Sequence, residues 1–277
     1  MRHKKLSHAV ITAPYTVWMA IFVLVPIALV VYYALTDVDG HFSAANITAI
    51  VDYGKTFGIS VELALISTAI CLLLAYPLAY TVSRMHSRKQ STMVMLIMLP
   101  MWMNFLIRTY AWIAILADKG LINSFLQQLG FSGIKMIGTR GAVVLGMVYN
   151  FLPYMILPIY TVLTKIESST IEAAQDLGAS RAQIFRRVLL PMSVPGIISG
   201  ITMVFVPAVS TFVISKLLGA GKTFLIGDII ENFFLGNTGT VDYNIGASLS
   251  LVLMLMILIS MAIMNHFDKD ESAGGLM

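Results

Sequence analysis

The stretch SSTIEAAQDLGASRAQIFRRVLLP, residues 168–191, is a polar interruption in an otherwise apolar chain, and the rest of the sequence is arranged around it. Two helix starts are predicted within it. Ser169 stands three positions before Glu172, and Ser180 stands three positions before Gln183, which is the spacing of a capping box. The stretch therefore predicts two short helices in succession.

A turn is expected between these helices. Gly178 stands where the first helix would end in the left-handed conformation that glycine adopts without steric cost. Pro191 has no backbone N–H and is expected to end the second helix. The second helix has an apolar face, formed by Ile184, Phe185, Val188 and Leu189, and a polar face, formed by Gln183, Arg186 and Arg187. Such a segment between two membrane spans is suited to dock into a groove of a partner.

These residues carry a resemblance to a known family. Glu172-Ala173-Ala174, then Gly178, then Val188-x-Leu190-Pro191 resemble the EAA loop of permease subunits in binding-protein-dependent ATP-binding-cassette (ABC) importers. Without the glycine and the Leu-Pro end, the triplet would fit an ordinary amphipathic loop equally well. The resemblance implies that the loop contacts an ATPase subunit through Glu172, Ala173, Ala174, Leu177, Gly178, Ile184, Phe185, Val188 and Pro191.

The bulk composition indicates a membrane protein. The 277 residues are 58% hydrophobic and only 12% charged, with a mean hydropathy of +0.84, whereas soluble domains carry roughly 25% charged residues. A span needs roughly 20 apolar residues, so the chain has room for about six. The single cysteine, Cys71, excludes a disulfide within the chain. We expect an all-α polytopic membrane protein with six transmembrane helices.

Six apolar segments stand out along the chain. They cover residues 15–35, 59–83, 93–116, 141–163, 194–217 and 246–266, and Pro100 interrupts the third. The first is too long for a signal-peptide core and lacks a cleavage site. The segments between and beside them are an N-terminus (1–14), a loop with a short helix at 121–129 (117–140), the EAA loop (164–192), a loop with an amphipathic part at 224–235 (218–245) and a polar tail (267–277).

Basic residues predict the orientation of these spans. With both termini in the cytoplasm, eleven Lys and Arg residues lie in inner segments and six in outer segments, while Arg108 lies within a span. Cytoplasmic loops are enriched in Lys and Arg, so this count supports the assignment and places the EAA loop in the cytoplasm. Because the basic residues flank spans and do not form one patch, no nucleic-acid partner is expected.

The chain offers no recognisable catalytic site. Gly221-Lys222-Thr223 matches the last three residues of a phosphate-binding loop, but residue 216 is Lys where that motif requires glycine. This loop is also predicted on the outer side of the membrane. No histidine stands in a zinc-binding pattern. We therefore expect no catalytic residue, no metal and no cofactor in this chain. If the chain is a transporter, ATP hydrolysis belongs to another subunit.

Polar side chains inside the spans form a second candidate site. Such groups are costly in a membrane and usually face a protein interior or an aqueous path. Each one alone is compatible with a hydrogen bond between helices, which is the favoured interpretation of a lone Ser or Thr, but as a set they favour a translocation path. An outward-pointing side chain or an ion pair stays open for Arg108, and an interfacial aromatic belt stays open for Tyr110 and Trp112. The set is Trp102, Asn104, Arg108, Tyr110, Tyr149, Asn150, Tyr154, Ser210 and Thr211. Asp228 and Glu231 are added because the family resemblance described next implies a cationic solute, for which carboxylates are suited.

The resemblance extends from the second span to the sixth and narrows to polyamine permeases. It is carried by Leu99-Pro100-x-Trp102-x-Asn104, Leu106-Ile107-Arg108-x-Tyr110, Lys119-Gly120-x-Ile122-Asn123, Tyr149-x-x-Leu152-Pro153, Asp176-Leu177-Gly178-Ala179-Ser180, Pro207-Ala208, Leu217-Leu218-Gly219 and Ile226-Gly227. Asp228 departs from the asparagine expected there. Of the two permeases in a spermidine/putrescine importer, the chain is more similar to the B-type.

This resemblance implies a single ABC transmembrane domain over residues 57–266, in a multi-pass subunit of the bacterial inner membrane. It also implies a homologous second permease, two ATPase subunits that bind ATP and magnesium, and an extracytoplasmic polyamine-binding protein. Two alternatives stay open. One is the same kind of permease with another solute, such as sulfate, iron or a sugar derivative. The other is a stand-alone secondary carrier or intramembrane enzyme.

Overall fold

The protein is described by a computed structural model over residues 13–37, 39–43, 46, 48, 50–236, 239 and 241–274, with side chains as far as 266. In this part of the chain the regular elements are helices, apart from one isolated antiparallel bridge between Thr36 and Phe42. Two compact units form. One is Met1–Gly54 with Ile229–Met256, and the other is Lys55–Asp228 with Ile257–Met277.

The described helices that could cross a membrane can be compared with the six expected spans. Five are long and apolar enough, namely Ala13–Ala34, Ile50–Ser83, Arg140–Leu163, Arg181–Ser210 and Tyr243–His266. A sixth is obtained if the pair Ser87–Trp102 and Phe105–Gln128, bent by 89°, is one span. This pair occupies the place of the third predicted segment, which is therefore two helices at a wide angle.

The smaller unit joins α2 (Val25–Ala34), which follows a π-helical turn η1 (Ala20–Leu24), to the first part of α14 (Tyr243–Gly274). Asn244 makes the junction, because its side-chain amide donates to the backbone carbonyls of Thr36 at 2.6 Å and Tyr33 at 3.2 Å. Ser248 adds a hydrogen bond to the carbonyl of Ala34 at 3.1 Å. The short η2 (Ile50–Tyr53) contacts the end of α13 (Ile226–Leu235) through Tyr53 and Phe233.

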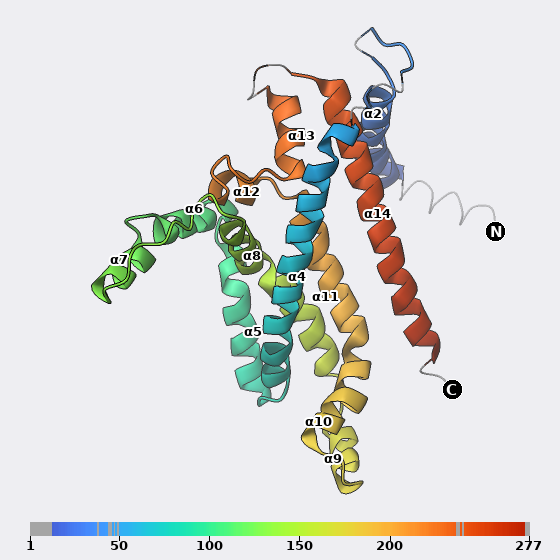
Figure 1. Cartoon of the computed structure of the whole chain (residues 1–277). Coiled ribbons are helices and arrows are strands. Elements are labelled where there is room, and N and C mark those ends of the chain that lie inside the picture. Colours follow the sequence, from blue (N-terminus) through green and yellow to red (C-terminus); the bar gives the residue numbers. More distant parts are fainter. Residues whose placement is uncertain are drawn as a thin grey trace, which may run out of the picture. The chain divides into compact units, whose positions relative to one another are not determined.

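The larger unit is built on α8 (Arg140–Leu163) and α11 (Leu190–Ser210), which pack along each other (Figure 1). Glycines permit this approach. A Cβ at Gly196 would come within 2.9 Å of the Pro158 carbonyl oxygen, and one at Gly200 within 2.7 Å of Met155 Sδ. Small residues allow helix backbones to pack closely where no water drives association. The α8–α11 pair is therefore the core of the unit.

The other helices of this unit surround that pair. α4 (Gly54–Ser83) reaches α8 through Ser67, whose hydroxyl lies 3.3 Å from Met147 Sδ, and reaches α11 through Tyr76. α12 (Val213–Leu218) packs on α8 where Gly146 faces Leu218. The remaining helices are α5 (Ser87–Trp102), α6 (Phe105–Leu116), α7 (Leu121–Gln128), α9 (Ser168–Asp176) and α10 (Arg181–Ile184).

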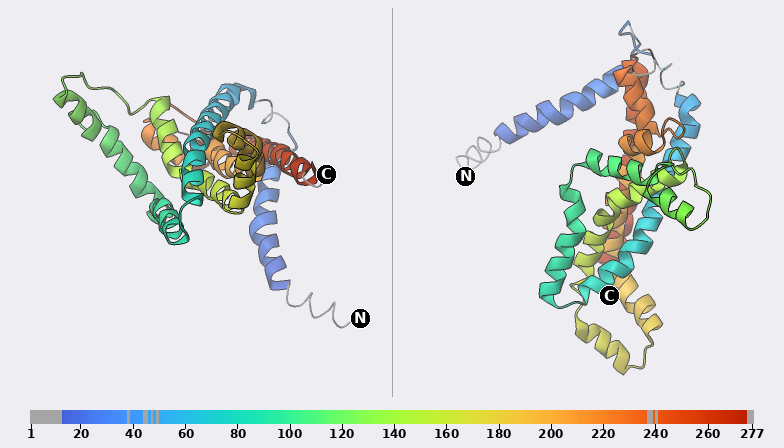
Figure 2. Two further views of the ribbon diagram at one scale, coloured as in Figure 1. Left: turned by 90° about the horizontal axis from the view of Figure 1, so that it is seen from below. Right: turned by 90° about the vertical axis from the view of Figure 1, so that its left-hand side faces the viewer.

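Within the larger unit the two candidate sites lie at opposite ends. α9 and α10 lie beyond the end of α11, whereas α6 and α12 lie near its other end, as both side views show (Figures 1 and 2). The fifth predicted span, 194–217, is also divided, because α11 ends at Ser210 and α12 begins at Val213. The α5–α6 break and the α11–α12 break therefore both lie at the end of the larger unit that carries the polar residues of the predicted path.

Candidate coupling segment and translocation path

The coupling segment, residues 164–191, has the predicted helix–turn–helix form. α9 ends at Asp176, and Gly178 follows with φ of +77°, the left-handed conformation expected of it. Ser180 then caps α10. Its hydroxyl accepts the N–H of Gln183 at 3.4 Å, and the Gln183 amide oxygen accepts the N–H of Ser180 at 2.7 Å. The second capping box and the glycine turn are confirmed.

Two details of the predicted segment are wrong. The N-cap of α9 is Glu167 and not Ser169, whose hydroxyl instead donates to the Glu167 carboxylate at 3.0 Å. Pro191 does not end the second helix, because Arg181–Ser210 is one continuous helix. The turn before the proline, η3 (Phe185–Leu189), is π-helical. In a π-helix each hydrogen bond spans five residues, one more than in an α-helix. The π-helical turn ends two residues before Pro191, whose ring in a regular α-helix would clash with the carbonyl four residues earlier.

The first helix and the turn form the exposed side of the segment. α9 has no buried residue, and Leu177 is 89% exposed beside the turn. The apolar face of the second helix is used differently, because Ile184 and Leu189 are buried and Phe185 lies edge-on against Tyr76 with ring centroids 5.5 Å apart. Part of that face therefore packs within the chain, while Phe185 is still 40% exposed, and α9 with Leu177 offers further exposed surface for a partner.

A tie from α4 holds the base of this segment. The Arg84 guanidinium, just beyond the end of α4, donates to the carbonyl of Ile166 at 3.1 Å, two residues before α9 begins. Its central carbon lies 5.7 Å from the centroid of the Tyr80 ring. Sequence reasoning missed Arg84 as a functional residue, since a basic residue in a short loop is expected there for topology alone.

The break between α5 and α6 gathers three residues of the predicted path. Trp102 ends α5 and is 71% exposed. Asn104 caps α6, because its side-chain oxygen accepts the N–H of Leu106 at 2.9 Å and more weakly that of Ile107 at 3.4 Å. Asparagine is among the preferred N-cap residues. The polar side chain of Asn104 is thus used locally to start the new helix.

Arg108 closes the same break from within. It is only 7% exposed, and its guanidinium donates to the Pro100 carbonyl at 2.8 Å, across the bend. The charge also lies 5.8 Å from the centroid of the Phe105 ring and 5.9 Å from that of Tyr149. Cation–π contacts of this kind stabilise an arginine that is removed from water. Arg108 therefore ties α5, α6 and α8 together.

α8 contributes the next residues of the set. Tyr149 is half-buried and packs edge-on against Trp112 of α6, with ring centroids 5.2 Å apart. Asn150 is buried, and its amide donates to the Gly146 carbonyl at 2.8 Å, while its side-chain oxygen has no hydrogen-bond partner among the described residues. A buried acceptor without a donor is costly and marks a place where water or solute would be bound.

A second group of path residues forms where α11 ends. A Cβ on Gly227 would lie 2.7 Å from the Ser210 carbonyl and 2.8 Å from that of Thr211, so the start of α13 contacts the α11–α12 break. Asp228 is 3% exposed and accepts the N–H of Leu225 at 2.7 Å. Sequence reasoning missed Ser60 of α4, which accepts the N–H of Ile226 at 2.8 Å.

The remaining predicted path residues lie outside these two groups. Tyr110 is 56% exposed and Tyr154 is 39% exposed, and the structure records neither in contact with Arg108. Glu231 is half-buried and belongs to the smaller unit, so it is described with α13 alone. The single predicted set is thus two clusters and three separate residues.

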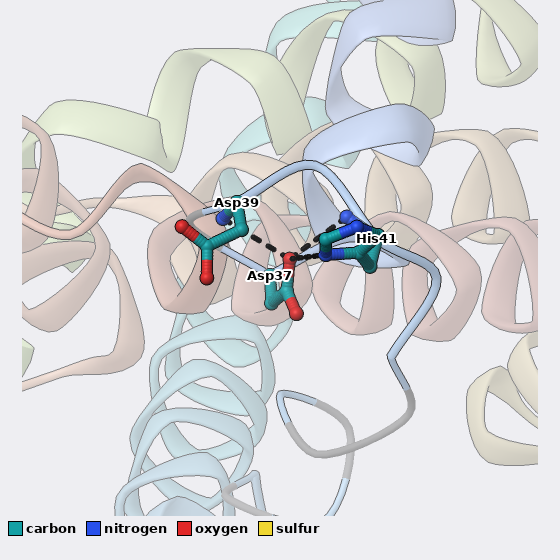
Figure 3. A group of neighbouring side chains, drawn as sticks. All are labelled: Asp37, Asp39 and His41. Atoms are coloured by element: carbon teal, nitrogen blue, oxygen red, sulfur yellow. Dashed lines mark hydrogen bonds and ion pairs between the residues drawn. The ribbon is translucent and has the colours of Figure 1, made fainter.

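An acidic turn in the smaller unit was not singled out from the sequence. The side chains of Asp37, Asp39 and His41 have oxygen and nitrogen atoms of the kind that bind metal ions, and these atoms lie within 4.8 Å of one another (Figure 3). The Asp37 carboxylate accepts the backbone N–H groups of His41 at 2.8 Å and Asp39 at 3.1 Å. The hydrogen bonds of this exposed turn account for the grouping.

Comparison with known proteins places the chain in a family. The model of the binding-protein-dependent transport system inner membrane component matches residues 1–272. This chain belongs to that family. Its helices and this family mark it as a multi-pass component of a bacterial inner membrane.

Curated relatives cover nearly the whole chain. The spermidine/putrescine transport system permease protein PotB of Haemophilus influenzae is 36% identical over 269 residues, which are 93% of this chain and 92% of that protein. PotB of Escherichia coli is 35% identical over 250 residues, which are 87% of this chain and 90% of that protein.

Solved structures support the same fold. A bacterial ABC transporter involved in the import of the acidic polysaccharide alginate contains a chain that matches with a TM-score of 0.77 at 18% identity, covering 97% of this chain and 96% of that one. The MetNI methionine ABC transporter matches with a TM-score of 0.55 at 16% identity, covering 78% and 94%. The all-α importer-permease fold is thereby confirmed.

Proposed function

We propose that the protein is the permease subunit of an ATP-driven ABC importer that carries polyamines such as spermidine and putrescine across the cytoplasmic membrane. One observation carries the coupling role: α9, the left-handed Gly178 and the capped α10 form an exposed helical turn beyond the end of the α8–α11 core. The PotB relatives, at 35% and 36% identity over most of the chain, support the substrate class.

This geometry supports a coupling role. ATPase subunits that bind ATP and magnesium would receive α9 and Leu177, and Glu172 on the exposed α9 would meet a basic residue there. Since α10 continues through η3 into α11, a displacement of α9 is transmitted to a helix of the core. The membrane half then alternates between inward and outward access, as expected of a transporter whose states differ little in free energy.

The path is proposed to run past the two breaks. Tyr149 and Trp112 present aromatic faces, and the free oxygen of Asn150 offers a hydrogen-bond acceptor to an ammonium group. Asp228 would contribute negative charge at the second break, with Ser210 and Thr211 beside it. A homologous permease would complete the path, and an extracytoplasmic binding protein would deliver the solute.

The experiment that tests this proposal is uptake of radiolabelled spermidine in a strain deleted for the gene and complemented with it. Restored uptake that unlabelled spermidine and putrescine both suppress is the expected result. The control strain carries Gly130→Val. This substitution replaces a glycine of left-handed conformation that lies outside the coupling segment. Restoration of sulfate, iron or sugar uptake without polyamine uptake would support an ABC importer permease but would contradict polyamines as its substrate. Full uptake by the chain without an ATPase would overturn both.

A further inference from the structure

An apolar groove runs along the outside of the larger unit, apart from the predicted path and beside the second helix of the coupling segment. Its volume is about 450 Å³, and it lies between α4 and the continuous helix of η3 and α11. The residues that line it include Leu73, Tyr76, Pro77 and Tyr80 from one side and Phe185 and Leu190 from the other. Leu73 is 73% exposed, so the groove opens to the surroundings of the unit.

The walls of this groove are held in place. The Tyr76 hydroxyl and Ser193 Oγ are hydrogen-bonded at 2.9 Å, which fixes α4 against α11. The Tyr76 ring lies edge-on to Phe185, which fixes α4 against η3. Both helices belong to segments that are long and apolar enough to cross a membrane. The groove therefore lies on a surface that faces lipid or another subunit.

One cation, Arg84, lies at the Tyr80 end of the groove. Arg84 lies over the Tyr80 ring, and two of its guanidinium nitrogens, Nε and Nη2, are buried without a hydrogen-bond partner among the described residues. Arg186 and Arg187 directly follow Phe185 in the sequence but line a separate pocket with Gln183. The exposed Glu167 follows Ile166, the residue whose carbonyl Arg84 binds. In the described part of the chain, the recorded ion pairs involve none of these arginines. An anion at the Tyr80 end would supply acceptors for these two Arg84 nitrogens.

We propose that the groove binds one acyl chain of an anionic phospholipid, whose phosphate lies beside Arg84. A helix with its side chains is about 10 Å across and would lie over a groove of this size, not in it. An extended hydrocarbon chain fits, and anionic headgroups are attracted by basic residues at the membrane surface. Tyr80 is placed as aromatic residues commonly are at the headgroup level.

The proposed lipid would stabilise the base of the coupling segment. Arg84 holds the Ile166 carbonyl just before α9, and Phe185 follows α10 directly. A lipid that contacts both would therefore join the two ends of that segment. This consequence rests on the proposed function, whereas the binding of the lipid does not. The test consequently measures binding and leaves transport aside.

The test is native mass spectrometry of the protein, purified with the subunits that accompany it, after incubation with phosphatidylglycerol or phosphatidylcholine. Leu73→Trp would occupy the groove, and Arg84→Gln would remove the charge. The matched controls are Leu65→Trp, at an exposed leucine of the same helix, and Arg88→Gln, at an exposed arginine in the first turn of α5. Loss of one basic contact is expected to lower phosphatidylglycerol occupancy about fivefold.

Retained phosphatidylglycerol on the unsubstituted protein and both controls, with loss in Leu73→Trp and Arg84→Gln, is the expected result. Equal loss or equal retention in all four variants would overturn the site. Equal binding of phosphatidylcholine would overturn the anionic lipid. Crosslinking of a photoreactive residue at Leu73 to an accompanying permease chain would show that a protein covers the groove, and it would overturn the proposal as well.

Discussion

At the scale of single residues, Gly178 has the most specific requirement in the coupling segment. Its φ of +77° is available to glycine, whereas a β-branched residue there is strained by about 1–3 kcal/mol. Nothing lies within 4 Å of a Cβ at this position, so the effect of a substitution is conformational and not steric. The direction in which the chain leaves α9 depends on this residue.

We predict that Gly178→Val leaves membrane insertion unchanged and abolishes ATP-coupled uptake, because α9 can no longer meet the ATPase in the same orientation. Insertion is measured by membrane fractionation and uptake with labelled polyamine. Gly130→Val is the matched control, since Gly130 has φ of +82° and equally free surroundings in another loop. Normal transport by Gly178→Val would remove the turn from the mechanism.

Leu177 and Glu172 allow the docking surface to be tested without backbone strain. Leu177 is 89% exposed, and exposed apolar residues at the centre of an interface commonly dominate its affinity. We predict that Leu177→Ala and Glu172→Ala each weaken recovery of the ATPase in a detergent pull-down by about tenfold, equivalent to about 1.4 kcal/mol. Leu121→Ala, at a leucine 73% exposed on α7, is the control. Undiminished recovery of the ATPase would exclude α9 as the contact.

At the scale of elements, the breaks and the helix contacts decide the arrangement. The α5–α6 bend is joined by the hydrogen bond from Arg108 to the Pro100 carbonyl, and hydrogen bonds from charged groups contribute about 1.5–3 kcal/mol. We predict that Arg108→Met lowers the melting temperature of the purified assembly, while Arg88→Met on the exposed part of α5 does not. Unchanged stability together with lost uptake would instead place the guanidinium in contact with the solute.

The α8–α11 contact depends on two glycines. Overpacking a well-packed interface costs typically about 1–3 kcal/mol, and a side chain at Gly196 would meet backbone, which does not move aside. We predict that Gly196→Val and Gly200→Val reduce the amount of folded protein in the membrane, as measured by fluorescence-detected size-exclusion chromatography. Gly141→Val, whose Cβ would meet only Thr139 Oγ1 at 3.8 Å, should be tolerated. Equal yields for all three would mean that the two helices separate at little cost.

At the scale of the whole molecule, the orientation in the membrane decides whether the proposed coupling is possible. We predict that a cysteine at Ala174 reacts with a membrane-impermeant maleimide only after the cells are permeabilised, whereas a cysteine at Leu121 reacts in intact cells. Cys71 is fully buried and should stay unlabelled. Labelling of Ala174→Cys in intact cells would place the coupling segment on the side opposite to any ATPase.

Much of this molecule follows from local sequence. Apolar length fixed the number of membrane-crossing segments to within one, because the cost of exposing polar backbone to lipid leaves little choice. Gly178 and the Ser180–Gln183 pair predicted their own turn and cap, since both depend on residues a few positions apart. The residues around the EAA loop were sufficient to recognise the family.

Tertiary contacts decided the rest. Whether Asn104 and Arg108 face a solute or tie a bend depends on Pro100 and Tyr149, which only the folded chain brings near. The helix continues through Pro191 after a π-helical turn that no local pattern predicts. The sequence predicts that the apolar face of residues 184–189 is available to a partner, but α4 covers part of this face in the folded chain. A pattern shows which side chains share a face, and only packing shows what that face meets.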